Sequence, residues 1–288
     1  MKVDAIILSD IHLTLDRPKC RLDDWEIFMI KTFQYIEGLR LTYNCPIICA
    51  GDLFDKHKPS PELLAFAFMY LPDDMWVVPG NHDLEAHNIK FLKKSGLYPL
   101  YVAEKIKIIN SGHWGDTDPQ PILKLGGREF IVWHVFTYKG ELPWKDCKAP
   151  DCKKVMSGLK CETIFTGDNH KTFMYKRGNQ LIFNAGSLFQ MKADQIDHKP
   201  VVGLWNAKSN TVTLHEIPRA PQGMISRAHL EIKQQKENRY GAFISNVKDY
   251  GVSIKGFEHN MDKFLISNTV SEKVKNVISK VMEELNEY

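Results

Sequence analysis

The sequence has no long apolar run: nothing in its 288 residues approaches the roughly 18 consecutive apolar residues that a membrane-spanning helix needs. It contains no low-complexity segment and no internal repeat with a period of about 20 to 50 residues. Its first residues lead directly into a predicted strand, without the pattern of a cleaved signal. With 43% hydrophobic and 25% charged residues, the composition is that of an ordinary globular protein. We therefore expect a soluble cytoplasmic protein with no membrane partner.

Cysteine pairs and excess charge are missing as well. The six cysteines form no Cys-x-x-Cys pair, which argues against a disulfide framework and against a thiolate zinc site. The 38 Lys and Arg residues are nearly balanced by 35 Asp and Glu residues, for a net charge of +3. A surplus this small neither indicates nor excludes a nucleic-acid partner.

Short apolar runs recur along most of the chain and predict buried strands. Helical patterns separate the early ones: one helix carries an apolar face from Trp25 to Ile36, and another follows Ser60, an N-cap residue placed before Pro61. This alternation predicts an α/β layered sandwich. The predicted strands are residues 3–8, 46–50, 75–78, 105–109, 130–133, 163–166, 181–183, 201–205 and 211–217.

A domain boundary is predicted near Pro218 and Pro221, where the character of the sequence changes. We expect a domain of residues 1–217 and a smaller α+β domain of residues 218–288. The latter ends in an amphipathic helix that begins with a capping box at residues 269–272. The helix packs within its own domain or docks onto a partner. Its apolar stripe consists of Val274, Val277, Ile278, Val281, Met282 and Leu285.

Polar residues suited to chemistry follow five of the predicted strands directly. Because the carboxyl ends of parallel strands share one edge of a sheet, these residues are expected in a common cleft. Each block alone is an ordinary cap or turn signal, but their recurrence at strand ends indicates a functional site. In chain order they are Asp10 with His12, Asp52, Asn81 with His82 and Asp83, His134, and Asp168 with His170.

This combination of carboxylates, imidazoles and one amide, without cysteine, is a ligand set for Mn²⁺, Fe or Zn²⁺. Seven candidate ligands are too many for one tetrahedral ion and suit two ions that share a carboxylate. Two such ions activate a water and stabilise the charge that develops in phosphoryl displacement. The expected chemistry is phosphoester hydrolysis.

The same blocks resemble the five motifs of the calcineurin-like metallophosphoesterase superfamily over about residues 1–190. They read Asp10-Ile11-His12, Gly51-Asp52, Gly80-Asn81-His82-Asp83, His134 and Gly167-Asp168-Asn169-His170. Within the superfamily the chain is most similar to SbcD-type nuclease subunits, including short phage versions. That narrower resemblance rests on residues 51–55, 184–187 and 194–200.

The resemblance implies a layered α/β/β/α metallophosphoesterase sandwich with a small C-terminal capping domain. It implies a metal-dependent DNA nuclease, an exonuclease or endonuclease, that acts in repair, recombination or replication. The implied partners are DNA and an SbcC-type coiled-coil ATPase, with a second copy of the chain as a further candidate. The implied cofactors are two divalent ions, with Mn²⁺ expected first and Mg²⁺, Fe or Zn²⁺ left open.

Carried over position by position, the resemblance also implies the role of each residue. The first ion is held by Asp10, His12 and His170, and Asp52 bridges the two ions. The second ion is held by Asn81, His134 and Asp168. The last motif departs from the usual Gly-His-x-His, because Asp168 stands where the family has a histidine. An aspartate there hardens the site towards Mn²⁺ or Mg²⁺, unless Asp168 misses the ion and leaves the second site weak.

The resemblance places His82 beside the scissile phosphate, where it protonates the leaving oxygen or stabilises charge. Histidine suits this role because an imidazole exchanges a proton near neutral pH. Asp83 is then expected to orient His82 by accepting a hydrogen bond. The alternative for Asp83 is a helix cap before Leu84.

Other residues near the motifs have two interpretations each. His57 and His87 contact substrate or are solvated loop histidines. The aromatic residues Trp133, Phe136 and Trp144 stack on bases, or pack in a core or lid.

Two further functions stay open at this point. The first is a phosphatase or phosphodiesterase acting on a nucleotide, a small diester or a phosphoprotein, because one two-metal site serves all of these. The second is a partner-binding scaffold whose metal site has decayed.

Overall fold

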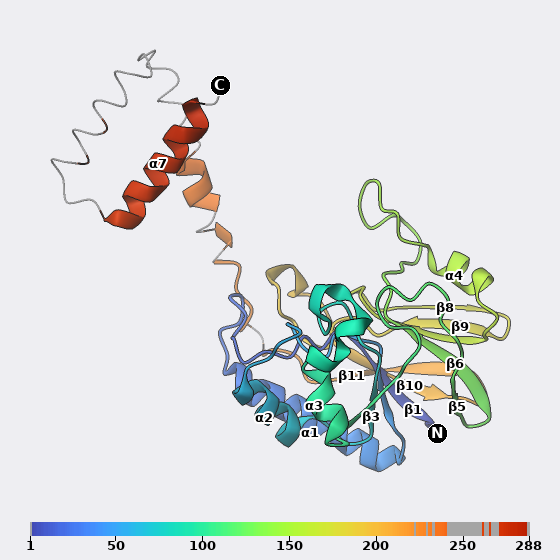
Figure 1. Ribbon diagram of the computed structural model, residues 1–288. Coiled ribbons are helices and arrows are strands. Elements are labelled where there is room, and N and C mark those ends of the chain that lie inside the picture. The colour runs from blue at the N-terminus through green and yellow to red at the C-terminus, as the bar shows by residue number, and fades with distance from the viewer. Residues whose placement is uncertain are drawn as a thin grey trace. The chain divides into compact units, whose positions relative to one another are not determined.

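The computed structural model describes residues 2–221, 223–228, 230–231, 234–240, 261, 265 and 271–286. It divides into two compact units, Met1–Arg227 and Ala228–Tyr288. The first unit contains two β-sheets with helices on their outer faces (Figure 1). Among the described residues, no helix is both long enough and apolar enough to span a membrane.

The first sheet has six strands in the order β11-β10-β1-β2-β3-β4. Strands β1 to β4 run parallel, and β10 and β11 extend the sheet in antiparallel pairing from β1. All parallel members of this sheet therefore end at one edge. The bounds are β1 (Ala5–Leu8), β2 (Ile47–Cys49), β3 (Met75–Val77), β4 (Ile106–Ile108), β10 (Val201–Asn206) and β11 (Thr211–Glu216).

The second sheet has five strands in the order β5-β6-β7-β9-β8. Its centre is the parallel set β6, β7 and β9, and the edge strands β5 and β8 pair antiparallel to it. The bounds are β5 (Leu123–Leu125), β6 (Arg128–Trp133), β7 (Thr163–Thr166), β8 (Phe173–Arg177) and β9 (Gln180–Asn184).

The two sheets pack face to face because their strands are apolar on both sides. In β1, Ala5 and Ile7 belong to the core between the sheets, whereas Ile6 and Leu8 belong to the core under the outer helices. In β9, Phe183 faces the first sheet, whereas Ile182 packs with α4 (Cys152–Gly158) on the opposite outer side. The expected α/β/β/α sandwich is confirmed.

The helices begin where the sequence supplies caps. Asp24 caps α1 (Trp25–Tyr43) by accepting a hydrogen bond from the Ile27 N–H at 3.1 Å. Ser60 caps α2 (Pro61–Tyr70) through the Leu63 N–H at 3.2 Å, as predicted. A short helix, α3 (Leu97–Val102), and three 3₁₀ turns, η1 (Glu85–His87), η2 (Ile89–Lys94) and η3 (Ala193–Gln195), lie in the connections.

Residues 218–221 and 223–227 belong to the first unit. The Ala220 N–H donates to Gln190 Oε1 at 3.1 Å, and the Leu22 N–H donates to the Met224 carbonyl at 2.9 Å. The structure therefore keeps this segment with the sandwich, although the sequence places it after the boundary at 217. The expectation that the smaller domain caps the larger one stays a prediction.

The second unit contains the expected C-terminal helix, α7 (Glu272–Asn286). Val274 and Val277 of its apolar stripe are 48% and 47% exposed, and Ile278 is half-buried. Part of the expected capping box, and the side chains of Val281, Met282 and Leu285, lie outside the described residues.

Candidate metal centre

The loops that follow β1 and β2 run side by side and place their polar residues together. The Asp10 N–H donates to the carbonyl of Gly51 at 3.0 Å, and the His12 N–H donates to the carbonyl of Asp52 at 3.0 Å. A third loop joins them, because the Leu188 N–H donates to the Asp10 carbonyl at 3.2 Å. Backbone hydrogen bonds therefore hold the site before any ligand is considered.

Four of the candidate ligands occupy the left-handed region of backbone space. The φ angles of Asp10, His12, Asp52 and Asp168 are 50°, 48°, 53° and 68°. Asp, Asn and His adopt this region more readily than other residues with side chains, and strained backbone of this kind clusters at functional sites. The sharp turn after each strand is what directs these side chains into the shared cleft.

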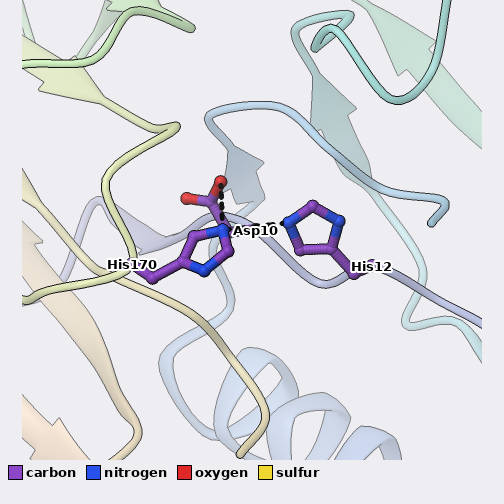
Figure 2. A group of neighbouring side chains, drawn as sticks. All are labelled: Asp10, His12 and His170. Carbon is purple, nitrogen blue, oxygen red and sulfur yellow. Dashed lines mark hydrogen bonds and ion pairs between the residues drawn. The ribbon is translucent and has the colours of Figure 1, made fainter. Parts of the chain in front are cut away.

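The first group of ligands is Asp10, His12 and His170, whose ligand atoms all lie within 4.8 Å of one another. The His12 and His170 Nε2 atoms face each other at 3.1 Å, and His170 Nε2 is 3.9 Å from Asp10 Oδ1. Figure 2 shows the His170 ring directed towards both neighbours. This is the set that the sequence assigns to the first ion.

The second group of ligands surrounds Asp52. Its Oδ2 is 3.4 Å from His134 Nε2 and 3.6 Å from His12 Nε2, so the Asp52 carboxylate lies between the two sets. Asn81 Oδ1 is 3.0 Å from the same His134 nitrogen. The Asp10 carboxylate also reaches this group. Asp52 thus has the position that a bridging ligand requires.

A glycine makes room for this carboxylate. A Cβ atom at Gly80 would lie 2.1 Å from Asp52 Oδ1 and 2.4 Å from the Asp52 backbone nitrogen. The His82 N–H donates to the same Oδ1 at 2.9 Å, which fixes the orientation of the carboxylate. The glycine of the Gly-Asn-His-Asp block therefore has a steric function in the site.

The carboxylates of the site accept hydrogen bonds from the protein, whereas the buried His12 Nδ1 has no hydrogen-bond partner among the described residues. Among the described residues, the carboxylates of Asp10 and Asp52 pair only with histidines and with no Lys or Arg. Buried carboxylates need compensating positive charge. The facing Nε2 atoms of His12 and His170 share a hydrogen bond at 3.1 Å, and a cation between them would take the place of its proton. The donors fit divalent ions that accept oxygen and imidazole ligands.

Burial and mutual interaction set the protonation of the two carboxylates. Burial raises the pKa of Asp10 to about 7, with His134 opposing the rise and Asp52 adding to it. Burial acts in the same direction on Asp52, but the charge and hydrogen bond of His134 outweigh it and hold the pKa of Asp52 below its usual range. Asp52 is the carboxylate that stays ionised.

The three candidate histidine ligands are in different protonation states. Burial lowers the pKa of His12 to about 3 and the pKa of His170 to about 4, so both are neutral at pH 7. Burial alone would lower the pKa of His134 too, but Asp52 and Asp10 raise it to about 10. The Nδ1 of His134 faces the Ala50 carbonyl at 2.7 Å, so the proton that balances Asp52 is on Nε2.

His82 is exposed at the edge of the cleft and contacts both sets of ligands. Its ring lies edge-on to that of His12, with ring centroids 4.6 Å apart. Its Nδ1 lies 2.7 Å from the backbone carbonyl of Asp55, to which Nδ1–H donates, so Nε2 is left for a substrate. Asp55 is a residue that the sequence interpretation did not assign. Its carboxylate lies near His12 and His82, and its position three residues after Asp52 was the available signal.

Both expectations for Asp83 are wrong. Its fully buried carboxylate accepts hydrogen bonds from the backbone N–H groups of Leu53, Phe54 and Gly80, at 3.2, 2.9 and 3.0 Å. It neither orients the His82 ring nor caps a helix. Burial raises the pKa of Asp83 to about 7, with Asp52 adding to the rise. Asp83 ties the loop after β3 to the loop after β2, which holds the ligand loops together.

Asp168 lies beside the ligands through its backbone. Its N–H donates to Asp10 Oδ1 at 3.0 Å. Burial raises the pKa of its carboxyl group, with His134 opposing the rise. Among the described residues, its carboxylate is outside the groups of ligand atoms that lie within 4.8 Å of one another. Ligation of the second ion by Asp168 stays a prediction.

Two hollows share His82 and Asp55 in their linings. One, of about 320 Å³, is also lined by Arg17, Lys19 and Lys192, with Asp16 among them. The other, of about 510 Å³, is lined by Lys56, Lys58, His57 and His87. None of these five Lys and Arg residues has an ion-pair partner within the described part of the chain. In each hollow the Lys and Arg residues outnumber the carboxylates by one.

Comparisons with known proteins agree on the fold. The model of the calcineurin-like phosphoesterase family matches residues 5–185. No curated protein matches the chain. Similar solved structures include an archaeal phosphodiesterase, with 14% identity, 74% of this chain and 98% of that chain covered, and a TM-score of 0.43.

Two further solved structures are of the same kind. A single mutant of Vps29 from Entamoeba histolytica has 16% identity, with 77% of this chain and 95% of that chain covered, and a TM-score of 0.42. A predicted phosphoesterase from Streptococcus pneumoniae has 14% identity, with 70% of this chain and 82% of that chain covered, and a TM-score of 0.34. Scores this low say nothing about the substrate of this chain.

Proposed function

This chain belongs to the calcineurin-like phosphoesterase family, and we propose that it is a metal-dependent nuclease that hydrolyses the phosphodiester bonds of DNA. The observation that carries the proposal is the pair of basic hollows that meet at His82. A small phosphate ester fills one side of such a centre, whereas a strand presents phosphates on both sides of the bond that is cut. Lysine and arginine residues next to the ligands provide the contacts that a phosphate backbone requires.

Two divalent ions would be held by the two ligand groups, with Asp52 between them. Asp10, His12 and His170 would hold one ion, and Asn81, His134 and Asp168 the other. When bound, such ions supply an activated water and positive charge for the developing phosphorane. We infer Mn²⁺ as the resident metal, because the donors are oxygen and imidazole and the usual histidine is replaced by Asp168.

The chain's own residues complete the reaction. The water oxygen forms the new bond to phosphorus as the bond to the leaving oxygen breaks, and the leaving oxygen gains a proton. His82 Nε2 is placed to donate that proton, because its Nδ1 is fixed on the Asp55 carbonyl. His12 supports the His82 ring edge-on and thereby limits its rotation. His134 must release its Nε2 proton to become a ligand.

The narrower identity is also a proposal. The resemblance of residues 51–55, 184–187 and 194–200 supports an SbcD-type subunit that works with an SbcC-type ATPase in DNA repair, recombination or replication. Part of that resemblance has a structural role, since Asn184 Nδ2 donates to the carbonyls of Asn169 and Lys171 at 2.6 and 2.9 Å and so holds the last ligand loop. The exposed Val274 and Val277 on α7 are the candidate contact for that partner.

The test is hydrolysis of defined linear and single-stranded DNA in Mn²⁺, Mg²⁺ or Zn²⁺, with bis(4-nitrophenyl) phosphate as a small diester. We expect His82→Ala to lower kcat on DNA by roughly 10²- to 10⁴-fold, the usual contribution of a general acid, while the bound metal stays unchanged. His215→Ala, a histidine on the edge strand β11 and outside both hollows, is the control. A protein that turns over the small diester but never DNA, alone or with an SbcC-type partner, contradicts the proposal. Less than one bound transition metal per chain would instead indicate a decayed scaffold.

A further inference from the structure

A long loop with an exposed tryptophan leaves the sandwich at the catalytic edge. No helix or strand lies between residues 134 and 151, and loops longer than about 12–15 residues without regular structure are usually functional in compact domains. Trp144 in this loop is 54% exposed, whereas the other five of the six tryptophans are buried or half-buried. Figure 1 shows the loop extending beyond α4. An exposed indole offers a flat aromatic face on which a ligand can stack.

The tryptophan is connected to the metal centre by packing and hydrogen bonds. The ring of Trp144 meets the ring of Phe136 edge-on, with centroids 5.0 Å apart. Phe136 follows the ligand His134 by two residues, a distance of at most about 7 Å along the chain. The next residue, Thr137, accepts a hydrogen bond from Asn169 Nδ2 at 2.7 Å, which ties the loop to the last ligand motif. The loop is therefore fixed at its base to two of the motifs that form the site.

The loop around the tryptophan carries charges of both signs, because Glu141 and Asp146 stand among its lysines, and the lysines are the groups that suit a phosphate. Lys145 follows Trp144 directly and Lys148 lies three residues further on, and neither has an ion-pair partner among the described residues. Lys139 at the start of the loop uses its Nζ on the Met174 carbonyl at 3.0 Å and keeps its charge exposed. An aromatic face next to free lysines matches the alternation of bases and phosphates in a single strand.

We propose that Trp144 stacks on an unpaired base of the strand whose backbone passes through the metal centre. The site would thus hold a flanking nucleotide of single-stranded DNA, or of a frayed duplex end, by base stacking rather than by base-specific hydrogen bonds. This inference rests on the proposed DNA nuclease function and adds the class of substrate. A protein partner would also cover an exposed tryptophan, but it would not require the adjacent unpaired lysines or the connection to the ligand motifs.

The first experiment uses the fluorescence of the full chain. Because Trp144 is the exposed tryptophan, stacking of a base on it should quench the long-wavelength part of the emission. The probes are a phosphorothioate oligothymidylate, which resists cleavage, and an abasic phosphorothioate strand of the same length and charge. We expect quenching by the oligothymidylate alone, and its loss in Trp144→Phe, which keeps an aromatic ring but removes the indole signal.

The second experiment measures binding and turnover. We expect Trp144→Leu to weaken binding of the oligothymidylate by between roughly fivefold and a hundredfold, the range for loss of one base–aromatic stack. Binding of the abasic strand and turnover of bis(4-nitrophenyl) phosphate should not change. Leu142→Ala is the matched control, because Leu142 is 56% exposed in the same loop. Its affinity should equal that of the unsubstituted chain.

Three results would overturn the inference. Equal quenching by both strands, or an equal loss of affinity for both in Trp144→Leu, would show that the loop acts through charge or shape. Unchanged affinity for the oligothymidylate in Trp144→Leu would show that the tryptophan has another occupant. Failure of the proposed function looks different: the unsubstituted chain would hydrolyse the small diester but would neither bind nor cut oligothymidylate.

Discussion

Replacing Asp83 with alanine should destabilise the whole sandwich. The carboxylate is 0% exposed and accepts three backbone N–H groups, those of Leu53, Phe54 and Gly80. Each buried N–H left without an acceptor costs about 1–3 kcal/mol. Even if water enters the space and satisfies some of them, we expect the free energy of unfolding to fall by at least about 3 kcal/mol. That is a large part of the total of about 5–15 kcal/mol that holds a typical domain.

The assay is urea denaturation in EDTA, so that lost metal affinity does not enter the measurement. Asp83→Asn should cost less than Asp83→Ala, because an amide keeps one oxygen acceptor and the shape of the side chain. Asp55→Ala is the control, since the side chain of Asp55 is 37% exposed, and surface substitutions usually change stability by about 0.5 kcal/mol or less. If Asp83→Ala unfolds within about 1 kcal/mol of the control, this carboxylate does not hold the ligand loops together.

Three further predictions concern the metal centre. The folded pKa of His134 is raised to about 10, so the stability that this protonation contributes is fully present below about pH 6.5 and is lost as the pH rises through 10. Titration calorimetry at pH 8 in buffers of different ionisation enthalpy should therefore show that the unsubstituted chain releases about one proton more on metal binding than His134→Asn does. Gly80→Ala would press a Cβ against Asp52, so it should lower stability by about 1–3 kcal/mol and weaken metal binding in a Mn²⁺ titration; unchanged affinity would refute the steric argument. Asp168→Ala should reduce bound metal from two ions to one by elemental analysis, whereas retention of both would mean that Asp168 is not a ligand.

The buried strands could be predicted from the sequence, and so could the edge strands β4 and β11. β1 and β2 are continuous apolar runs, and such runs are typical of central parallel strands. The edge strands β5 and β8 were missed because they are half-exposed and mix lysine, arginine and apolar residues. Their pairing depends on the neighbouring strand rather than on their own composition.

The position of the site could also be predicted, because parallel strands must end at a common edge. The hydrogen bonds that hold the ligand loops and the His82 ring could not be predicted. The order of Asn81, His82 and Asp83 does not reveal that the Asp83 carboxylate accepts hydrogen bonds from backbone N–H groups about 30 residues earlier in the chain. The support of His82 by a backbone carbonyl was equally hidden, since every residue supplies a carbonyl and the sequence cannot show which one is in reach.

The left-handed backbone at Asp10, His12, Asp52 and Asp168 restricts which amino acids these positions accept, whatever the metal. Aspartate, asparagine, histidine and glycine fit, whereas a β-branched or bulky side chain strains the turn. A change of ligand at these four positions is therefore limited to this short set of amino acids. The restriction also suggests an informative variant, Asp52→Asn. It removes the charge of the Asp52 carboxylate, and asparagine still suits the left-handed backbone at this position. Such a variant separates the chemistry of the centre from the folding of the loops that form it.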